Sequence, residues 1–274
     1  MTTEFSGGGD PDRSLRLLWQ APEGRRRGPR PKLSVEQITH TAIRLADAEG
    51  LTAVSMRRIA EKLGVSAMSL YTYVPGKAEL IDLMVDATLG EAGRRFEARG
   101  WRERLTAIAR ERWALYHRHP WMLQVATHRP ALGPNLIANY DHELRAVDGI
   151  GLTDLEMDSV ISLITGYVQG AARSSVEAAD VERRTGITDH QWWQAHAPLL
   201  ERVFDADRHP LAARVGAAAG EAYQAASAPA HQFEFGLRRI LDGIDVLVRT
   251  RVAGNGRTTG PRTADPRTTV DPGA

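Results

Sequence analysis

The sequence predicts an all-α protein, and three observations indicate this fold class. Apolar residues recur three or four positions apart over most of the chain between residues 33 and 253. Residues that commonly begin and end helices, such as serine, threonine and glycine, flank these periodic stretches. Alternating β-branched runs and hairpin-turn signals are missing, apart from Gly254-Asn255-Gly256 near the carboxyl end.

The length and composition exclude several classes of protein. The chain has 274 residues, 42% of them hydrophobic and 25% charged, as in ordinary globular proteins of about two domains. It contains no cysteine, which excludes a disulfide framework, a thiol nucleophile and a thiolate metal site. No apolar run approaches the ~20 residues that span a bilayer, and the amino end lacks the layout of a secretion signal. We expect a soluble, cytoplasmic protein with no membrane partner.

Composition divides the chain into four parts. Residues 1–32 contain glycine and proline breaks and a basic cluster, and we expect a disordered basic arm. Residues 33–89 predict short helices, and residues 90–253 predict longer ones. Residues 254–274 are rich in Gly, Pro, Thr and Arg without an apolar period, which is typical of a flexible tail.

The first helices of the 33–89 part have clear end signals. Ser34 with Gln37 forms a capping-box pattern, and Gly50 ends the helix that follows. Ser55 can cap a short second helix, after which Gly64 suits a left-handed position.

A third short helix and a fourth follow. Ser66 can cap the third, which is expected to reach Tyr73, before Pro75-Gly76 breaks the chain. The fourth begins near Lys77.

Beyond residue 100 the expected helices lengthen. Pro134 occupies a first-turn position, and Thr153 with Glu156 forms a second capping box before a long helix. Residues 181–228 are less regular, and a last helix is expected from about residue 230 to residue 252.

Two short helices joined by a glycine turn, after a longer supporting helix, form a helix-turn-helix pattern. In this motif the second short helix lies in the major groove of DNA. The apolar residues that would hold the pair together are Ile59, Ala60, Leu63, Val65 and Leu70. The residues left on the outside of the second helix are Ser66, Ala67, Ser69, Thr72 and Tyr73. Small outward side chains suit a groove about 12 Å wide.

The charge distribution agrees with a nucleic-acid partner. Residues 25–77 carry ten Lys or Arg against four Asp or Glu, a net charge of +6 in a chain whose total is +1. A basic segment beside an acidic remainder favours binding of a polyanion. A solvated charged face has the same composition, so charge alone leaves both interpretations open.

Residues 54–66 and 69–80, VSMRRIAEKLGVS and SLYTYVPGKAEL, resemble the N-terminal domain of the tetracycline-repressor (TetR) family of transcriptional regulators. Residues 233–244, FEFGLRRILDGI, are similar to the end of the tetracycline-repressor type of C-terminal domain. The resemblance implies a three-helix DNA-binding domain followed by a helical domain for effector binding and dimerisation. It also implies a repressor of a palindromic double-stranded DNA operator, released by a small apolar effector.

The resemblance assigns DNA-binding roles by position. Arg57 matches a base-edge contact, and arginine to guanine is the commonest specific contact. Lys77 matches a phosphate contact at a helix start, where the helix dipole favours an anion. The full implied set is Ser55, Arg57, Ser66, Ala67, Met68, Ser69, Tyr71, Tyr73 and Lys77. Met68 and Tyr71 could instead be packing residues, and the basic cluster at 25–32 could touch DNA or only solubilise the arm.

A palindromic operator calls for a two-fold dimer. Two of the expected helices have apolar stripes at 4-3-4 spacing, and the resemblance favours their pairing with a second copy as a four-helix bundle. The implied interface is Val160, Ile164, Tyr167, Phe233, Leu237, Ile240, Ile244 and Leu247. The spacing alone equally fits an intramolecular core.

Aromatic and methionine residues in the middle of the second domain suit an apolar effector pocket. The candidates are Trp113, Tyr116, Trp121, Met122, Val125, His128, Tyr140 and Tyr167, although each could be ordinary core. The tetracycline repressor binds a magnesium–drug complex through histidines that align near Gly93 and Val125. Neither histidine is present, so tetracycline is not the expected effector.

The main alternative from another class is a helical enzyme, for example a di-metal protein. That site needs Glu-x-x-His pairs, and none of the nine histidines has a glutamate three residues before it. Nucleotide-binding and hydrolase motifs are also missing. We therefore expect no enzymatic activity, cofactor or metal. An activator, or a DNA-binding protein without an effector, remains open because the sign of regulation depends on operator position.

Overall fold

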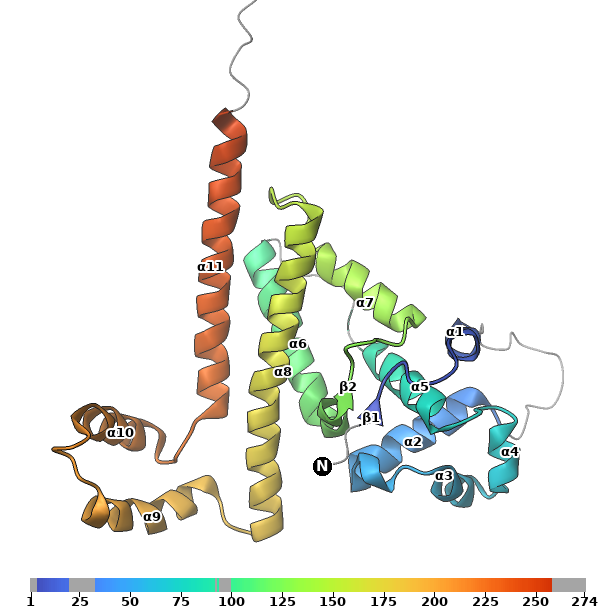
Figure 1. Ribbon diagram of the computed structural model, residues 1–274, viewed down its shortest axis with the longest axis horizontal. Helices are drawn as coiled ribbons and strands as arrows, with labels where there is room; N and C mark the ends of the chain where they lie inside the picture. The colour runs from blue at the N-terminus through green and yellow to red at the C-terminus, as the bar shows by residue number, and fades with distance from the viewer. Residues whose placement is uncertain (1–3, 20–32, 92, 94–99, 258–274) are drawn as a thin grey trace, which may run out of the picture.

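The computed structural model describes residues 4–19, 33–91, 93 and 100–257 (Figure 1). Over these residues the chain forms eleven α-helices and two strands of two residues each, which confirms the expected all-α class. None of the helices in the described part has the length and apolar character needed to cross a membrane.

The elements follow the chain in two groups. The first group is β1 (Glu4–Phe5), α1 (Pro11–Trp19), α2 (Val35–Glu49), the 3-10 turn η1 (Leu51–Ala53), α3 (Met56–Leu63), α4 (Ala67–Tyr71) and α5 (Lys77–Leu89). The second group is α6 (Trp101–Arg118), the 3-10 turn η2 (Pro120–Gln124), β2 (Val125–Ala126), α7 (Pro134–Leu144), α8 (Asp154–Thr185), α9 (Asp189–Val203), α10 (Pro210–Tyr223) and α11 (Pro229–Arg257). We call α2–α5 the head and α6–α11 the body.

The helix ends of the head follow local side-chain signals. The Ser34 hydroxyl accepts a hydrogen bond from the Gln37 amide, and the Ser55 hydroxyl accepts one from the Arg58 amide. Gly64 ends α3 with a left-handed φ of 68°, as predicted. These caps satisfy backbone groups that a helix terminus leaves without intrahelical partners.

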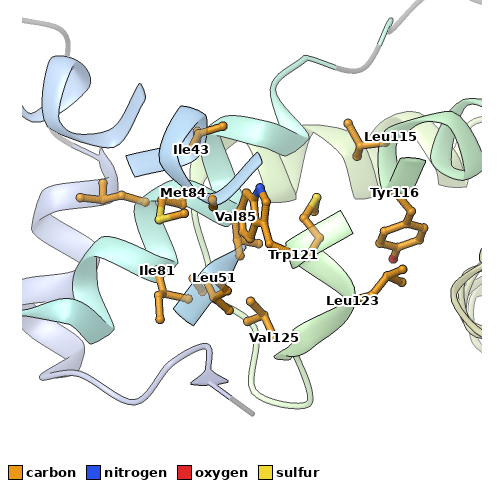
Figure 2. Close-up of a cluster of buried hydrophobic side chains, with 14 of the residues drawn as sticks. Ile43, Leu51, Ile81, Met84, Val85, Leu115, Tyr116, Trp121, Leu123 and Val125 are labelled. Carbon is orange, nitrogen blue, oxygen red and sulfur yellow. The ribbon is translucent and has the colours of Figure 1, made fainter. Parts of the chain in front are cut away.

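The apolar core runs without a break from the head into the body. Figure 2 shows Leu51 and Met84 of the head close to Trp121 and Val125, which follow α6. A polar link reinforces this junction, because Asp86 of α5 accepts a 2.9 Å hydrogen bond from the amide of Leu136 in the first turn of α7. The core therefore resists independent movement of the head.

Within the body, α8 packs against α6 on one side and α11 on the other. In Figure 1 the long helices α8 and α11 run roughly alongside each other, and α9 and α10 lie apart from them at one end. Residues 181–228, which lacked a clear pattern, contain the end of α8 and both of these helices.

The expectation of disorder for residues 1–32 is wrong for residues 4–19. β1 pairs in parallel with β2, and α1 packs against α5, burying Leu18. The Trp19 indole also donates a 2.8 Å hydrogen bond to the Leu132 carbonyl. These partners lie far away in the sequence, so local composition gave no sign of them. Residues 20–32, with the basic cluster, lie outside the described residues.

Three expected boundaries also shift. α4 ends at Tyr71 instead of Tyr73. α8 continues to Thr185, into the stretch from residue 181 that was expected to be less regular. α11 continues to Arg257, so the first four residues of the predicted tail, 254–257, are helical. Residues 258–274 lie outside the described part.

Candidate nucleic-acid interface

The α3–α4 pair is held by buried apolar residues at the turn. Ile59, Ala60 and Leu70 are 2% exposed or less, and Leu63 and Val65 are partly buried against the same core. The amide of Val65 also donates a 3.0 Å hydrogen bond to the Ala60 carbonyl, which closes the turn. The angle between the two short helices is therefore set by packing, as the helix-turn-helix pattern predicts.

The outer face of α4 is open to solvent. Met68 and Tyr71 are 77% and 48% exposed, and Tyr73 just beyond the helix is exposed as well. Ser66 caps the helix by accepting from the Ser69 amide, and Ala67 is half-buried. The packing alternative for Met68 and Tyr71 is thus wrong, because neither side chain enters the core.

Two charged residues near α4, Arg57 and Lys77, already have partners within the protein. Arg57 is exposed and pairs with Glu61 one turn along α3, at 3.1 Å between Nε and Oε1. Lys77, at the first position of α5, forms a 2.7 Å ion pair with Glu4 of β1. Sequence reasoning missed Glu4, since nothing near it in the chain marks it as a partner of α5.

None of the predicted effector residues lines the cavity or the groove described below. Tyr116, Trp121, Met122 and Val125 are buried in packed core. Trp113 stacks on the Phe233 ring at 4.2 Å between centroids.

The other predicted effector residues are less enclosed. Tyr140 is exposed and donates a 2.7 Å hydrogen bond to Asp158, which raises the pKa of its phenol. His128 is exposed too. Tyr167 of α8 faces α11, where its hydroxyl donates a hydrogen bond to the Phe233 carbonyl.

A small cavity and a larger groove lie among the described residues. A small cavity of about 30 Å³ lies between the end of α5, α6 and α7, beside the ion pair of Arg112 and Glu143. A groove of about 340 Å³ runs between α8 and α11, lined in part by Leu163, Gly243 and Leu247. Sequence reasoning missed the Arg112–Glu143 pair, whose partners lie 31 residues apart without a shared motif.

The predicted dimer residues mostly pack inside one chain. Val160, Ile164, Phe233, Leu237 and Ile244 are each below 5% exposed in the single chain. The residues at the seam between α8 and α11 are thus core of the body, the alternative that the spacing left open. Ile240 and Leu247 are partly exposed in the groove. Other apolar residues of the two helices face solvent, namely Leu155, Leu163, Phe235 and Val246.

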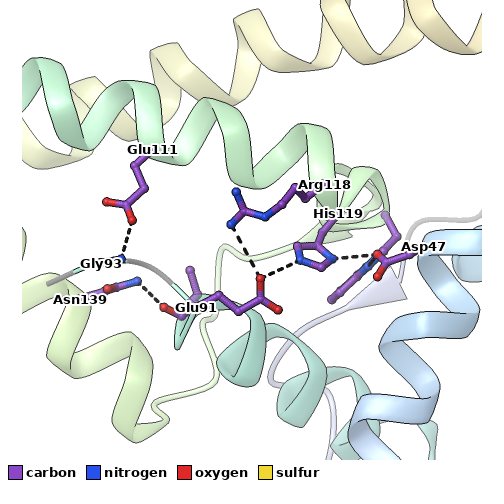
Figure 3. A network of polar contacts seen from close by, with 9 residues as sticks. Asp47, Glu91, Gly93, Glu111, Arg118, His119 and Asn139 are labelled. Atoms are coloured by element: carbon purple, nitrogen blue, oxygen red, sulfur yellow. Dashed lines mark hydrogen bonds and ion pairs between the residues drawn. The ribbon is translucent and has the colours of Figure 1, made fainter.

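A polar network joins the head to the body (Figure 3). His119, just after α6, is buried, and its Nδ1 lies 2.8 Å from Asp47 of α2. Its Nε2 lies 3.1 Å from Glu91, which also faces Arg118 at 3.7 Å. The Trp121 indole donates to the same Asp47 oxygen at 2.8 Å. The end of α6 is therefore tied to the helix that supports α3 and α4.

This arrangement defines a helix-turn-helix protein in which the second short helix, α4, is exposed and the body is almost entirely helical. Comparison with known proteins identifies the family to which this helix-turn-helix protein belongs. The family model for bacterial regulatory proteins of the tetR family matches residues 38–84. The model for the tetracycline repressor-like C-terminal domain matches residues 95–248. The chain therefore belongs to the TetR family of helix-turn-helix transcriptional regulators.

Individual relatives agree. The chain is 45% identical over 259 residues to the HTH-type transcriptional repressor DrrR1 of Streptomyces coeruleorubidus, covering 91% of each protein. The crystal structure of apo ActR from Streptomyces coelicolor is similar at 25% identity and a TM-score of 0.64, covering 84% of this chain and all of that one. ActR in complex with actinorhodin has a TM-score of 0.65 at 25% identity, covering 77% of this chain and 94% of that one.

Proposed function

We propose that this protein is a repressor that binds an inverted-repeat operator as a homodimer and is released by a small-molecule effector. The observation that carries the proposal is the solvent-facing side of α4, where Met68 and Tyr71 project from a helix fixed by buried Leu70. Such a helix can enter the major groove without rearrangement of the head.

In this proposal the predicted DNA-binding residues divide into two groups. Arg57 contacts a base edge, and the apolar start of α4 at Ala67 and Met68 reads thymine methyl groups. Ser69 lies at the same base-facing start of α4. The remaining predicted residues lie around it as phosphate or backbone contacts, namely Ser55, Ser66, Tyr71, Tyr73 and Lys77. Phosphate contacts hold the protein in register, and base contacts select the sequence.

Dimerisation is proposed through the outer faces of α8 and α11. Leu163 and Val246 are more than half exposed there, and the groove between the helices is bordered by apolar side chains. A Cβ added at Gly166 or Gly170 would meet no atom within 4 Å, so a partner helix can approach closely.

The helices α9 and α10 extend this surface. α9 has no buried side chain in the single chain. The exposed apolar residues of the two helices are Trp192, Leu199, Leu200, Val203, Leu211 and Val215. Apolar area of this extent is commonly covered by a partner, and we assign that role to the second subunit.

Effector binding is proposed in the body, near the predicted aromatic residues. The solved complex of ActR with actinorhodin, a structure similar to this one, supports binding of a small molecule by a protein of this fold. The described cavity of about 30 Å³ has room for about one water molecule, so α6 and α7 must separate to admit an effector. Movement of α6 would pull on His119 and hence on Asp47 of the head.

Repression is proposed because the relative that is 45% identical is named a transcriptional repressor. An activator that uses the same head is the alternative, and a regulator without an effector is the second. A reporter gene placed behind the bound site distinguishes repression from activation.

Selection of bound fragments from genomic DNA tests the proposal. Fragments that share an inverted repeat, and a reporter that rises when the protein is deleted, support it. Actinorhodin is the first effector probe, and loss of the DNA complex on its addition would support release by a ligand. Failure to enrich any shared sequence would contradict the DNA-binding assignment.

Arg57→Ala tests the base contact within this proposal. We expect operator binding to weaken by about 1–3 kcal/mol and specificity to relax at one base pair, because a guanine loses its bidentate partner. Folding should change little, since Arg57 is exposed and its ion pair with Glu61 spans one helical turn. Arg16→Ala in α1 removes a similar exposed i,i+4 pair and serves as the control in the same titration. Equal affinity for the two variants would remove Arg57 from the interface.

A further inference from the structure

Residues 4–19 form a segment that lies outside both matched family regions, 38–84 and 95–248, yet contacts both head and body. We call this segment the strap. Its strand β1 pairs in parallel with β2, with Glu4 opposite Val125, and the Ser6 amide continues the pairing to the Ala126 carbonyl at 3.1 Å. The strap is therefore fixed to the body at its start.

A single buried hydroxyl joins the strap to both parts of the protein. Ser6 donates a 2.9 Å hydrogen bond to Asp82 of α5 and accepts a 3.1 Å hydrogen bond from the Ala131 amide. The Gly7 amide donates to the same Asp82 oxygen at 2.8 Å. Gly7 has a φ of +68°, and a Cβ there would lie 2.7 Å from the Arg129 carbonyl oxygen, so this tight passage requires glycine.

These contacts hold the Glu4 carboxylate at the start of α5. Its Oε1 lies 2.7 Å from Nζ of Lys77, the residue that we assign to an operator phosphate. The side chains of Lys77 and Glu4 keep 38% and 30% of their area exposed. An ion pair with this much exposure is weak enough for a phosphate to replace.

We propose that Glu4 competes with an operator phosphate for Lys77, so that the strap lowers operator affinity in the free protein. This inference rests on the proposed function. The Lys77 ammonium has three N–H donors, so the competition is for its positive charge: a carboxylate 2.7 Å away offsets part of the charge that attracts a phosphate, and strand pairing keeps that carboxylate close by. The operator therefore gains the full attraction of Lys77 only when Glu4 moves away, and any change that lifts β1 from β2 frees Lys77 for the operator.

A double-mutant cycle tests the competition. The selected operator fragment is titrated at one salt concentration with wild type, Glu4→Gln, Lys77→Gln and the double variant. We expect Glu4→Gln to tighten binding about two- to fivefold, which is the scale of an exposed ion pair. We expect Lys77→Gln to weaken binding and to lower the salt slope by about 1. In the Lys77→Gln background, Glu4→Gln should not increase operator affinity.

Asp12→Asn is the matched control, because it removes one carboxylate from the same strap, where Asp12 forms an exposed ion pair with Arg16 one helical turn along α1. It reports the general effect of one lost negative charge on DNA affinity. The inference is overturned if Glu4→Gln tightens binding no more than Asp12→Asn, if its gain persists without Lys77, or if it weakens binding.

The same titrations distinguish failure of the proposed function from failure of the competition between Glu4 and a phosphate. If wild type shows no sequence-specific, salt-dependent binding, both the function and the inference are overturned. If wild type binds but Lys77→Gln leaves affinity and salt slope unchanged, Lys77 is not a phosphate contact and only the competition is overturned.

Discussion

The head and the body differ in how far apart in the sequence their structural determinants lie. In the head, Ser55 caps α3 and Gly64 ends it, and each acts on residues within one helical turn. The body depends on distant partners: the Trp121 indole donates a hydrogen bond to Asp47 of the head across 74 residues. Arg110 of α6 binds Glu234 of α11 across 124 residues. The proposed DNA-reading surface thus follows from local signals, whereas the proposed effector and dimer surfaces depend on how distant helices pack.

The largest expected effect is a loss of stability in α4, where one substitution tests packing and a neighbouring one tests DNA recognition. Leu70→Ala should lower the free energy of unfolding by about 2–5 kcal/mol, because Leu70 is fully buried beneath the helix pair. Met68→Ala, two positions away and 77% exposed, should change stability by less than about 0.5 kcal/mol while still weakening operator binding. Denaturant unfolding and operator titration of both variants measure the two effects. Equal losses of stability would show that α4 is not oriented as described.

The second largest expected effect is the loss of stability caused by Gly236→Ala, which tests the long-range packing of the body. A Cβ at Gly236 of α11 would lie 2.7 Å from Cζ of Tyr167, whose hydroxyl donates to the Phe233 carbonyl at 2.8 Å. Gly236→Ala should therefore destabilise the protein by about 1–3 kcal/mol through overpacking.

Gly216→Ala in α10 is the control for Gly236→Ala. An added Cβ there meets nothing within 4 Å, so helix propensity should raise stability by up to about 1 kcal/mol. Thermal unfolding of the two variants measures the difference. A gain of stability in Gly236→Ala would contradict the described contact between α8 and α11.

The smallest expected effect is the pH dependence of stability that arises from the ion pair between α6 and α11. The two hydrogen bonds from Arg110, each 2.9 Å, lower the pKa of Glu234 below its ordinary value of 4.5. The pair therefore stabilises the protein above about pH 4.5, and this contribution is lost as pH falls through the lowered pKa. Because both side chains are substantially exposed, the contribution should stay below about 1 kcal/mol. Unfolding of wild type and Glu234→Gln should differ at neutral pH and converge in acid, and a constant difference would exclude the pair as its cause.

The fold of the head could be predicted because its signals are contiguous. The serine caps at positions 34, 55 and 66 lie beside the amides that they cap, and Leu70 falls on the buried face at the predicted spacing. The exposure of Met68 follows from the same helical period. The orientation of α4, on which the candidate site depends, therefore follows from the local pattern of the sequence.

The remaining features depend on partners that a linear pattern does not show. The strap contains only a short apolar stretch, and its order comes from α5 and β2. Phe233 and Leu237 fit either an internal seam or an interface by spacing alone, and the structure places them inside the chain. Tyr116 and Trp121 are of the aromatic type that often lines a ligand pocket, but the structure buries both in packed core.

The central claim is that α4 reads bases in the major groove, and methylation interference on the selected operator tests it most directly. Dimethyl sulfate modifies guanine N7, which faces the major groove, and adenine N3, which faces the minor groove. We predict that guanine methylation blocks binding within two half-sites separated by about one helical turn or a multiple of it. Interference from adenine N3 alone, or from no base at all, would contradict the claim.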